Sequence, residues 1–204
     1  VATGFEVMEA REIAEYGYGK YEDVITSLQF ERLASASGPT AGEIKRPSDG
    51  KEPENIVFIQ CVGSRDQAKG ISYCSKICCM YTAKHTMLYK HKVHDGQAYV
   101  FYMDIRAFGK DFDQYYERCR AMDNVKYIRS IPSRVIQMPG TNDLRLGFLN
   151  EDRKYIEQEF DLVILAVGID PKSTVTKNIK QLGIDTNTYG FCMTDRLLPV
   201  ETSV

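Results

Sequence analysis

Four of the six cysteines in this 204-residue sequence lie close together, in the order C-x12-C-x3-C-C: Cys61, Cys74, Cys78 and Cys79. Residues 61–79 are called the cysteine stretch below. Thiolates bind iron and zinc, and they are also the nucleophiles of disulfide exchange. If a helix has begun at Cys74, Cys74 and Cys78 share one of its faces. A disulfide between the neighbours Cys78 and Cys79 would strain the peptide that joins them. The spacing therefore predicts a metal or redox site.

The position of the cysteine stretch favours an anionic ligand. Cys61 follows the apolar run Ile56–Gln60 and so lies at the end of an expected strand. A strand end followed by a helix N-terminus is where dinucleotide-binding folds hold a pyrophosphate, because the helix N–H groups and dipole favour negative charge. A [4Fe–4S] cluster bound by four thiolates is also an anion. The position and the donor set together favour a cluster where a nucleotide would otherwise bind.

Three alternatives remain open from the spacing. Four cysteines also form tetrahedral zinc sites, although those commonly use CxxC pairs, which this sequence lacks. Cys78 and Cys79 could instead cycle with a disulfide, or all four residues could be buried structural thiols. Of the remaining two cysteines, we expect Cys119 to be a core thiol on an apolar helix face and Cys192 to be a packed strand-edge residue.

The elements that must position these residues alternate between strands and helices. Helices are expected over 24–36, 75–94 and 111–122, and strands over 56–60, 98–104, 125–129 and 160–168. Three shorter strands are expected over 134–138, 144–149 and 154–157. This order predicts an α/β fold, a Rossmann-like three-layer parallel sheet with an antiparallel β-meander. Residues 37–55 are rich in Gly, Pro, Ser and charge, which indicates a surface loop and a domain junction.

Composition narrows the class of protein. The net charge of −2 gives no electrostatic basis for binding nucleic acid, and no apolar run is long enough for direct membrane insertion. The clustering of the cysteines favours a reducing, cytoplasmic location over a secreted disulfide framework. The sequence starts without Met or a signal-peptide pattern, and we expect it to be an internal piece of a longer protein.

The sequence resembles the A subunit of heterodisulfide reductase and the related A subunit of the quinone-interacting membrane-bound oxidoreductase of sulfate reducers. The residues that carry the resemblance are IQCVGSRD (59–66), YCSKICCMYTAKH (73–85), FYMDIRAFGKDFDQYYERC (101–119) and YGFCMTDRLLPVETSV (189–204). That family consists of iron–sulfur flavoproteins with a thioredoxin-reductase-like core, which bind FAD and several [4Fe–4S] clusters. The resemblance implies that Cys61, Cys74, Cys78 and Cys79 hold one cluster, and that Lys84 faces the flavin ring.

The same resemblance implies a domain organisation. Flavoprotein disulfide reductases insert a nicotinamide domain between two halves of a flavin domain. On this basis we expect a flavin-domain remnant and linker at 1–50, the inserted domain with the cysteine stretch at 51–164, and a returning flavin-domain segment at 165–204. Gly4 and Gly168 would end the two turns that border the flavin. Because no GxGxxG is present, this chain alone is not expected to retain FAD or to be active.

The function we expect is electron transfer between FAD and [4Fe–4S] clusters within a multi-subunit oxidoreductase of methanogenesis or sulfate reduction. The expected partners are subunits similar to B and C of heterodisulfide reductase, a hydrogenase, or membrane quinone-linked subunits. The alternatives are a zinc-stabilised partner-docking module and a thiol–disulfide oxidoreductase that uses Cys78 and Cys79.

The sequence gives weaker indications of a role for several charged residues and for the histidines. Arg65 and Lys69 could offset the charge of a cluster or dock a partner. Asp104, Arg106 and Lys110 follow a strand at the position where nicotinamide domains recognise ribose, a weak signal for NAD(P). We expect the three histidines, His85, His91 and His94, to be solvated near the end of one helix.

Overall fold

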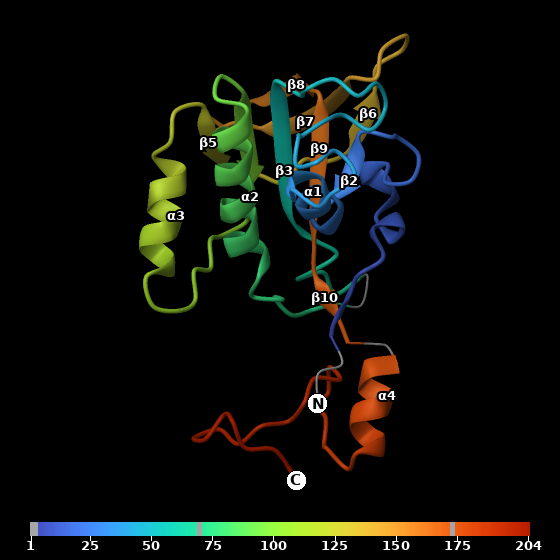
Figure 1. Cartoon of the computed structure of the whole chain (residues 1–204), viewed down its shortest axis with the longest axis vertical. Coiled ribbons are helices and arrows are strands. Elements are labelled where there is room, and N and C mark those ends of the chain that lie inside the picture. The colour runs from blue at the N-terminus through green and yellow to red at the C-terminus, as the bar shows by residue number, and fades with distance from the viewer. Residues whose placement is uncertain (1–3, 69–70, 172–173) are drawn as a thin grey trace. The chain divides into compact units, whose positions relative to one another are not determined.

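The computed structural model describes residues 4–68, 71–171 and 174–204 of the chain, which divides into two compact units (Figure 1). The larger unit comprises Glu9–Gly168 and contains the cysteine stretch. The smaller unit comprises Val1–Met8 and Ile169–Val204. Within the described residues, no helix combines the length and apolar character that crossing a bilayer requires.

A five-stranded parallel sheet forms the centre of the larger unit, with the strand order β2-β9-β3-β4-β5. Its strands are β2 (Val24–Thr26), β3 (Asn55–Val62), β4 (Gln97–Phe101), β5 (Val125–Ile128) and β9 (Leu162–Val167). The two central strands, β3 and β9, are apolar along nearly their whole length because both of their faces are covered.

Three helices cover one face of this sheet: α1 (Ser27–Ala34), α2 (Cys78–Lys92) and α3 (Phe112–Arg120) (Figure 1). Their contacts form one core in which Phe58 of β3 packs with Phe30 of α1 and Tyr89 of α2. The rings of Phe30 and Phe58 meet edge to face with their centroids 5.5 Å apart. This packing fixes α2, which begins with two of the four cysteines, against the strand that carries the first one.

An antiparallel meander covers the other face. Its strands, in the order β6-β7-β8, are β6 (Val135–Gln137), β7 (Leu144–Leu149) and β8 (Tyr155–Phe160). Alternate side chains of β4 point away from the helices and toward the meander. The ring centroids of Tyr99 and Phe160 lie 5.1 Å apart, and those of Phe101 and Phe148 lie 4.5 Å apart. Helices, parallel sheet and meander are therefore three layers, and the predicted α/β fold class is confirmed.

Two of the predicted helices begin later than expected. Residues 24–26 are not helical, because Val24, Ile25 and Thr26 form edge strand β2 beside β9, and the Thr26 side chain then caps α1 in a capping box with Gln29. The helix predicted over 75–94 begins only at Cys78, because Lys76 has a φ of +62° that no α-helix accommodates. Strand β4 also ends at Phe101, earlier than predicted.

The segment 37–55 is less exposed than its composition indicates. Ile44 and Arg46 are buried, and the Arg46 guanidinium binds the carboxylate of Asp23, which is 1% exposed, at 3.1 Å. Arg46 also reaches Asp143 in the turn between β6 and β7 at 3.1 Å. Residues 9–50, which include the short 3-10 helices Ala10–Glu12 and Ala14–Tyr16, thus pack in the same unit as the parallel sheet. The assignment of flavin-domain segments stays a prediction.

The smaller unit brings together segments from both ends of the chain. Strand β1 (Glu6–Val7) pairs antiparallel with β10 (Ile169–Asp170), and the only other helix among the described residues, α4 (Thr174–Gln181), follows. Cys192 forms an isolated bridge with Thr186 and is exposed, so the prediction that it is packed is wrong.

Candidate metal centre

Strand β3 is irregular where it reaches the first cysteine. Its register against β9 shifts between Ile59 and Val62, and Cys61, which lies between them, has a φ of +59°. Few residues other than glycine adopt this left-handed conformation, and such bulges change the direction in which a side chain points. The irregularity therefore takes Cys61 out of the regular ladder at the carboxyl end of the sheet.

The chain after Cys61 turns back on itself. The Arg65 N–H donates to the Tyr73 carbonyl at 3.1 Å, and the Asp66 N–H donates to the Ile71 carbonyl at 2.9 Å. These bonds return Cys74 toward the base of the loop. Cys74 lies in the loop and not in α2, so the condition under which Cys74 and Cys78 would share a helical face is not met.

Cys78 and Cys79 are the first two residues of α2, and both are buried. The residue before them, Ile77, offers no side-chain cap to the N–H groups of the first turn. Such N–H groups and the helix dipole favour negative charge at this end. Two thiolates would therefore be stabilised where the sequence places these cysteines.

The four thiols lie in one neighbourhood. Burial is the largest cause that raises the pKa of Cys61 to about 11 and that of Cys78 to about 12, and the neighbouring thiols contribute to both increases. Burial also raises the pKa of Cys79, with Cys74 adding to the effect. A raised pKa disfavours the thiolate form of Cys61, Cys78 and Cys79, and this makes Cys78 and Cys79 poor nucleophiles for disulfide exchange.

Backbone N–H groups already point at two of the sulfurs. The Lys76 N–H donates to Cys74 Sγ at 3.3 Å, and the Arg106 N–H donates to Cys79 Sγ at 3.4 Å. N–H···S bonds of this kind stabilise iron-bound thiolates. Arg106 thus contributes its backbone N–H to the thiol site, and the weak NAD(P) signal from Asp104, Arg106 and Lys110 stays a prediction.

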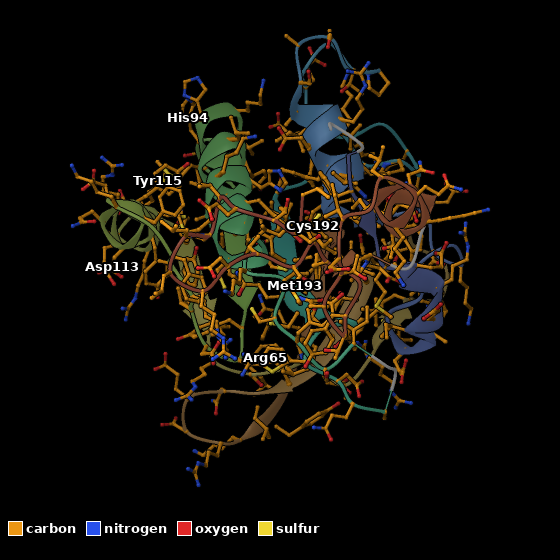
Figure 2. The ribbon with its side chains drawn as sticks, turned by 90° about the horizontal axis from the view of Figure 1, so that it is seen from below. Arg65, His94, Asp113, Tyr115, Cys192 and Met193 are labelled. Carbon is orange, nitrogen blue, oxygen red and sulfur yellow. The ribbon has the colours of Figure 1, made fainter. Side chains whose placement is uncertain are left out.

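Two arginines and the carboxylate that pairs with both of them lie beside the site. Arg65 contacts the Cys61 thiol and pairs with Asp104 at 2.7 Å, and Arg106 pairs with the same carboxylate at 3.2 Å. Burial alone would raise the pKa of Asp104, but the hydrogen bonds from the two arginines lower it, so Asp104 remains charged and holds both arginines. Lys69 lies outside the described residues, and Lys110 is exposed. Figure 2 labels Arg65, whose role beside a cluster stays a prediction.

Gly168 closes β9 against the cysteine stretch. A Cβ at this position would lie 1.9 Å from Ser64 Oγ and 2.7 Å from Ser75 Oγ. The absence of a side chain at Gly168 therefore lets the loop that carries Cys61 and Cys74 approach the strand end. Gly4, in the smaller unit, has a φ of +74°, while Ala2 and Thr3 lie outside the described residues. The flavin-binding roles of Gly4 and Gly168 stay predictions.

Lys84 lies two turns into α2 and reaches α1. Its ammonium group is 2.5 Å from the carboxylate of Glu31, and half of its side chain is exposed. The neighbouring His85 is buried at 2% exposure and also contacts Glu31, so the prediction that all three histidines are solvated is wrong for this one. His91 and His94 are exposed as expected, and Figure 2 shows His94 beyond the end of α2. The predicted role of Lys84 toward flavin stays a prediction.

Sequence reasoning missed two residues of the site. Tyr81 donates to the Val167 carbonyl at 2.9 Å and contacts the Cys78 thiol, one turn away on α2. Gln60, 1% exposed, lies beside Cys79. A signal for Gln60 was present, since it is a polar residue inside an otherwise apolar buried strand. Cys119 is a fully buried core thiol, as predicted.

Close relatives share this stretch of chain. The iron–sulfur A subunit 1 of CoB–CoM heterodisulfide reductase from Methanopyrus kandleri is 45% identical over the whole chain, which matches 32% of that relative. The A subunit of H(2):CoB-CoM heterodisulfide,ferredoxin reductase from Methanothermobacter thermautotrophicus is 42% identical over 99% of the chain and 31% of the relative. The chain belongs to the heterodisulfide reductase A-subunit family. It spans about a third of the length of these homologues, and no family model matches it.

Solved structures share the fold. T. acidophilum thioredoxin reductase aligns with a TM-score of 0.55 at 15% identity, covering 99% of this chain and 52% of that structure. L-lysine 6-monooxygenase from Pseudomonas syringae aligns with a TM-score of 0.55 at 9% identity, covering 95% of this chain and 51% of that structure. At these identities the likeness establishes the reductase-like fold alone.

Proposed function

We propose that Cys61, Cys74, Cys78 and Cys79 hold a [4Fe–4S] cluster. The observation that carries the proposal is the gathering of four mutually interacting thiols between the end of β3 and the start of α2. Bound iron would supply positive charge that favours the thiolate form of the cysteines. The helix N-terminus, two backbone N–H donors and two arginines then stabilise the thiolates.

A single zinc ion is less compatible with this arrangement. Zinc needs its sulfur ligands about 2.3 Å from one point. In a cube-shaped cluster each thiolate binds a different iron, which suits the adjacent Cys78 and Cys79.

The cluster would exchange single electrons with FAD in an iron–sulfur flavoprotein. The name of the M. kandleri homologue, an iron–sulfur A subunit, supports this assignment, as does the thioredoxin-reductase-like fold. We assign Gly4 and Gly168 to the backbone turns beside the flavin and Lys84 to its ring, where a cation would stabilise the reduced, anionic flavin. The half-exposed Lys84 ammonium would have to leave Glu31, or share it, to do so.

The wider role we propose is that of an oxidoreductase subunit in a multi-subunit complex. The M. thermautotrophicus homologue is named as the A subunit of an H(2)-dependent heterodisulfide and ferredoxin reductase. By homology, this chain would work with subunits similar to B and C, a hydrogenase or quinone-linked membrane subunits, in the cytoplasm. Methanogenesis or sulfate reduction would supply the electron carriers.

Iron and zinc content tests the proposal. The protein should be purified and reconstituted without oxygen, and its visible spectrum recorded before and after dithionite. About four irons per chain, with a broad absorbance that bleaches, would support the cluster. One zinc and no colour would contradict it.

Substitution then tests the ligand assignment. Cys74→Ser should sharply reduce the iron content, whereas Cys192→Ser, on the exposed cysteine of the smaller unit, should leave it unchanged. The buried Cys119→Ser is a second control, because Cys119 contacts Ala83 and Tyr127 and not the other thiols. Equal iron in Cys74→Ser and the controls would exclude Cys74 as a ligand.

A further inference from the structure

The side-chain amide of Gln60 is buried beside the thiol site with only half of its hydrogen-bonding groups satisfied. Gln60 immediately precedes Cys61 on β3 and is 1% exposed. Its Oε1 lies 3.5 Å from Cys79 Sγ and accepts from that thiol. Its Nε2 is buried and has no hydrogen-bond partner among the described residues. Buried amide groups without a partner are uncommon and call for an explanation.

Either end of the Gln60 amide can face Cys79 Sγ, because a half-turn exchanges its oxygen and nitrogen and the sulfur lies 3.5 Å from this group. A protonated Cys79 thiol can donate to Gln60 Oε1 at 3.5 Å or to the Asp104 carbonyl at 3.8 Å. Iron binding releases the thiol proton to solvent, and the sulfur then only accepts. Oε1 and a thiolate would repel each other at 3.5 Å. A half-turn of the amide exchanges its oxygen and nitrogen and places Nε2 against the sulfur.

This turn would give the unpartnered Nε2 a charge-assisted hydrogen bond. The carbonyl oxygen would take the position that Nε2 now occupies, and an under-satisfied carbonyl is tolerated better than an unpaired N–H group. The sulfur of Cys79 would then accept from two N–H donors, because the backbone N–H of Arg106 already lies 3.4 Å away.

We propose that the Gln60 amide donates a hydrogen bond to the iron-bound sulfur of Cys79 and raises the reduction potential of the cluster. The inference rests on the proposed cluster. Each N–H···S bond withdraws negative charge from the sulfur and so favours the reduced, more negative state. Gln60 is thus a positioning and tuning residue, not a ligand.

Gln60→Met tests the proposal, because it keeps a long unbranched side chain and removes the N–H donor. The wild-type and variant proteins should be reconstituted without oxygen and analysed for iron and sulfide per chain. The midpoint potential should then be measured by redox titration followed by EPR. The signal that is lost in Cys74→Ser identifies the cluster to be followed. We expect Gln60→Met to retain its iron and to show a lower midpoint potential.

Thr82→Val is the matched control. Thr82 is fully buried in the first turns of α2, and its hydroxyl also has no partner among the described residues. Its replacement removes a buried polar group without removing a donor from Cys79, so the midpoint potential should not change. Gln60→Leu provides a second loss of the donor in case methionine packs poorly.

The outcomes are distinct. A lower potential in both Gln60 variants, with full iron and an unchanged Thr82→Val, supports the inference. An unchanged potential with full iron overturns it and leaves the cluster in place. Loss of iron in both Gln60 variants, with iron retained in Thr82→Val, also overturns it, because Gln60 would then hold the site together and not tune it. Absence of iron from the wild type would overturn the proposed function itself.

Discussion

Replacing Gly168 with alanine should push the cysteine stretch away from β9. The new Cβ would lie 1.9 Å from Ser64 Oγ and 2.7 Å from Ser75 Oγ, whereas real contacts stay above 3.0 Å. Ser64 is 2% exposed, so its hydroxyl has little room to move. Gly168 is outside the left-handed region, so steric contact accounts for the effect. Overpacking of this kind lowers the free energy of unfolding by about 1–3 kcal/mol.

Urea denaturation followed by circular dichroism would measure that loss. Iron uptake should fall as well, because Ser64 and Ser75 lie in the loop that carries Cys61 and Cys74. Gly140→Ala is the control, since its Cβ would meet nothing within 4 Å and only its φ of +80° is unfavourable. Gly140→Ala should lower the free energy of unfolding by about 1–2 kcal/mol and leave iron uptake unchanged.

A second substitution tests the steric reasoning. In a Gly168→Ala/Ser64→Ala double variant the contact at 1.9 Å is gone, leaving Ser75 Oγ at 2.7 Å and Ser64 Cβ at 3.3 Å. Stability should recover in part, with a coupling of at least about 0.5 kcal/mol between the two sites. The steric explanation would be refuted if the effects of the two substitutions on the free energy of unfolding were strictly additive. It would also be refuted if Gly168→Ala had the stability and iron content of the wild type.

Three further predictions concern the larger unit and the thiols. Arg46→Met should destabilise by about 3–5 kcal/mol in urea, because it leaves the buried Asp23 carboxylate without its cation; a loss below about 1 kcal/mol would show that the pair contributes little. Burial lowers the pKa of His85 despite Glu31, so the unfolded chain binds its proton first. The urea midpoint should therefore fall as the pH drops below the usual histidine range near 6.5, and less so in His85→Phe; equal slopes would contradict this. In metal-free protein at about pH 7.5, iodoacetamide should modify the exposed Cys192 first and Cys78, with its pKa of about 12, very slowly, as judged by peptide mass spectrometry. Rapid modification of Cys78 would instead favour a thiol–disulfide enzyme.

Local sequence was sufficient for most of the elements. The apolar runs of β3 and β9 and the turn residues between β6, β7 and β8 each carry their own signal. The predicted element boundaries and exposures were wrong where a residue contacts a partner that lies far along the chain. Val24–Thr26 look helical in isolation and become a strand because β9 offers them a ladder. Arg46 looks solvated in isolation and is buried because Asp23 and Asp143 reach it.

The sequence by itself determined the fold class and supplied the proposed donor set, because both depend on residue types and on spacing along the chain. It identified Cys61, Cys74, Cys78 and Cys79, and the alternation of strands and helices that places them at a strand end and a helix start. Only the tertiary structure decided what surrounds those sulfurs. The Arg106 N–H, the Gln60 amide and the Gly168 strand end reach the site from different elements. Burial and hydrogen bonding depend on which elements pack together, and no local pattern encodes those distances.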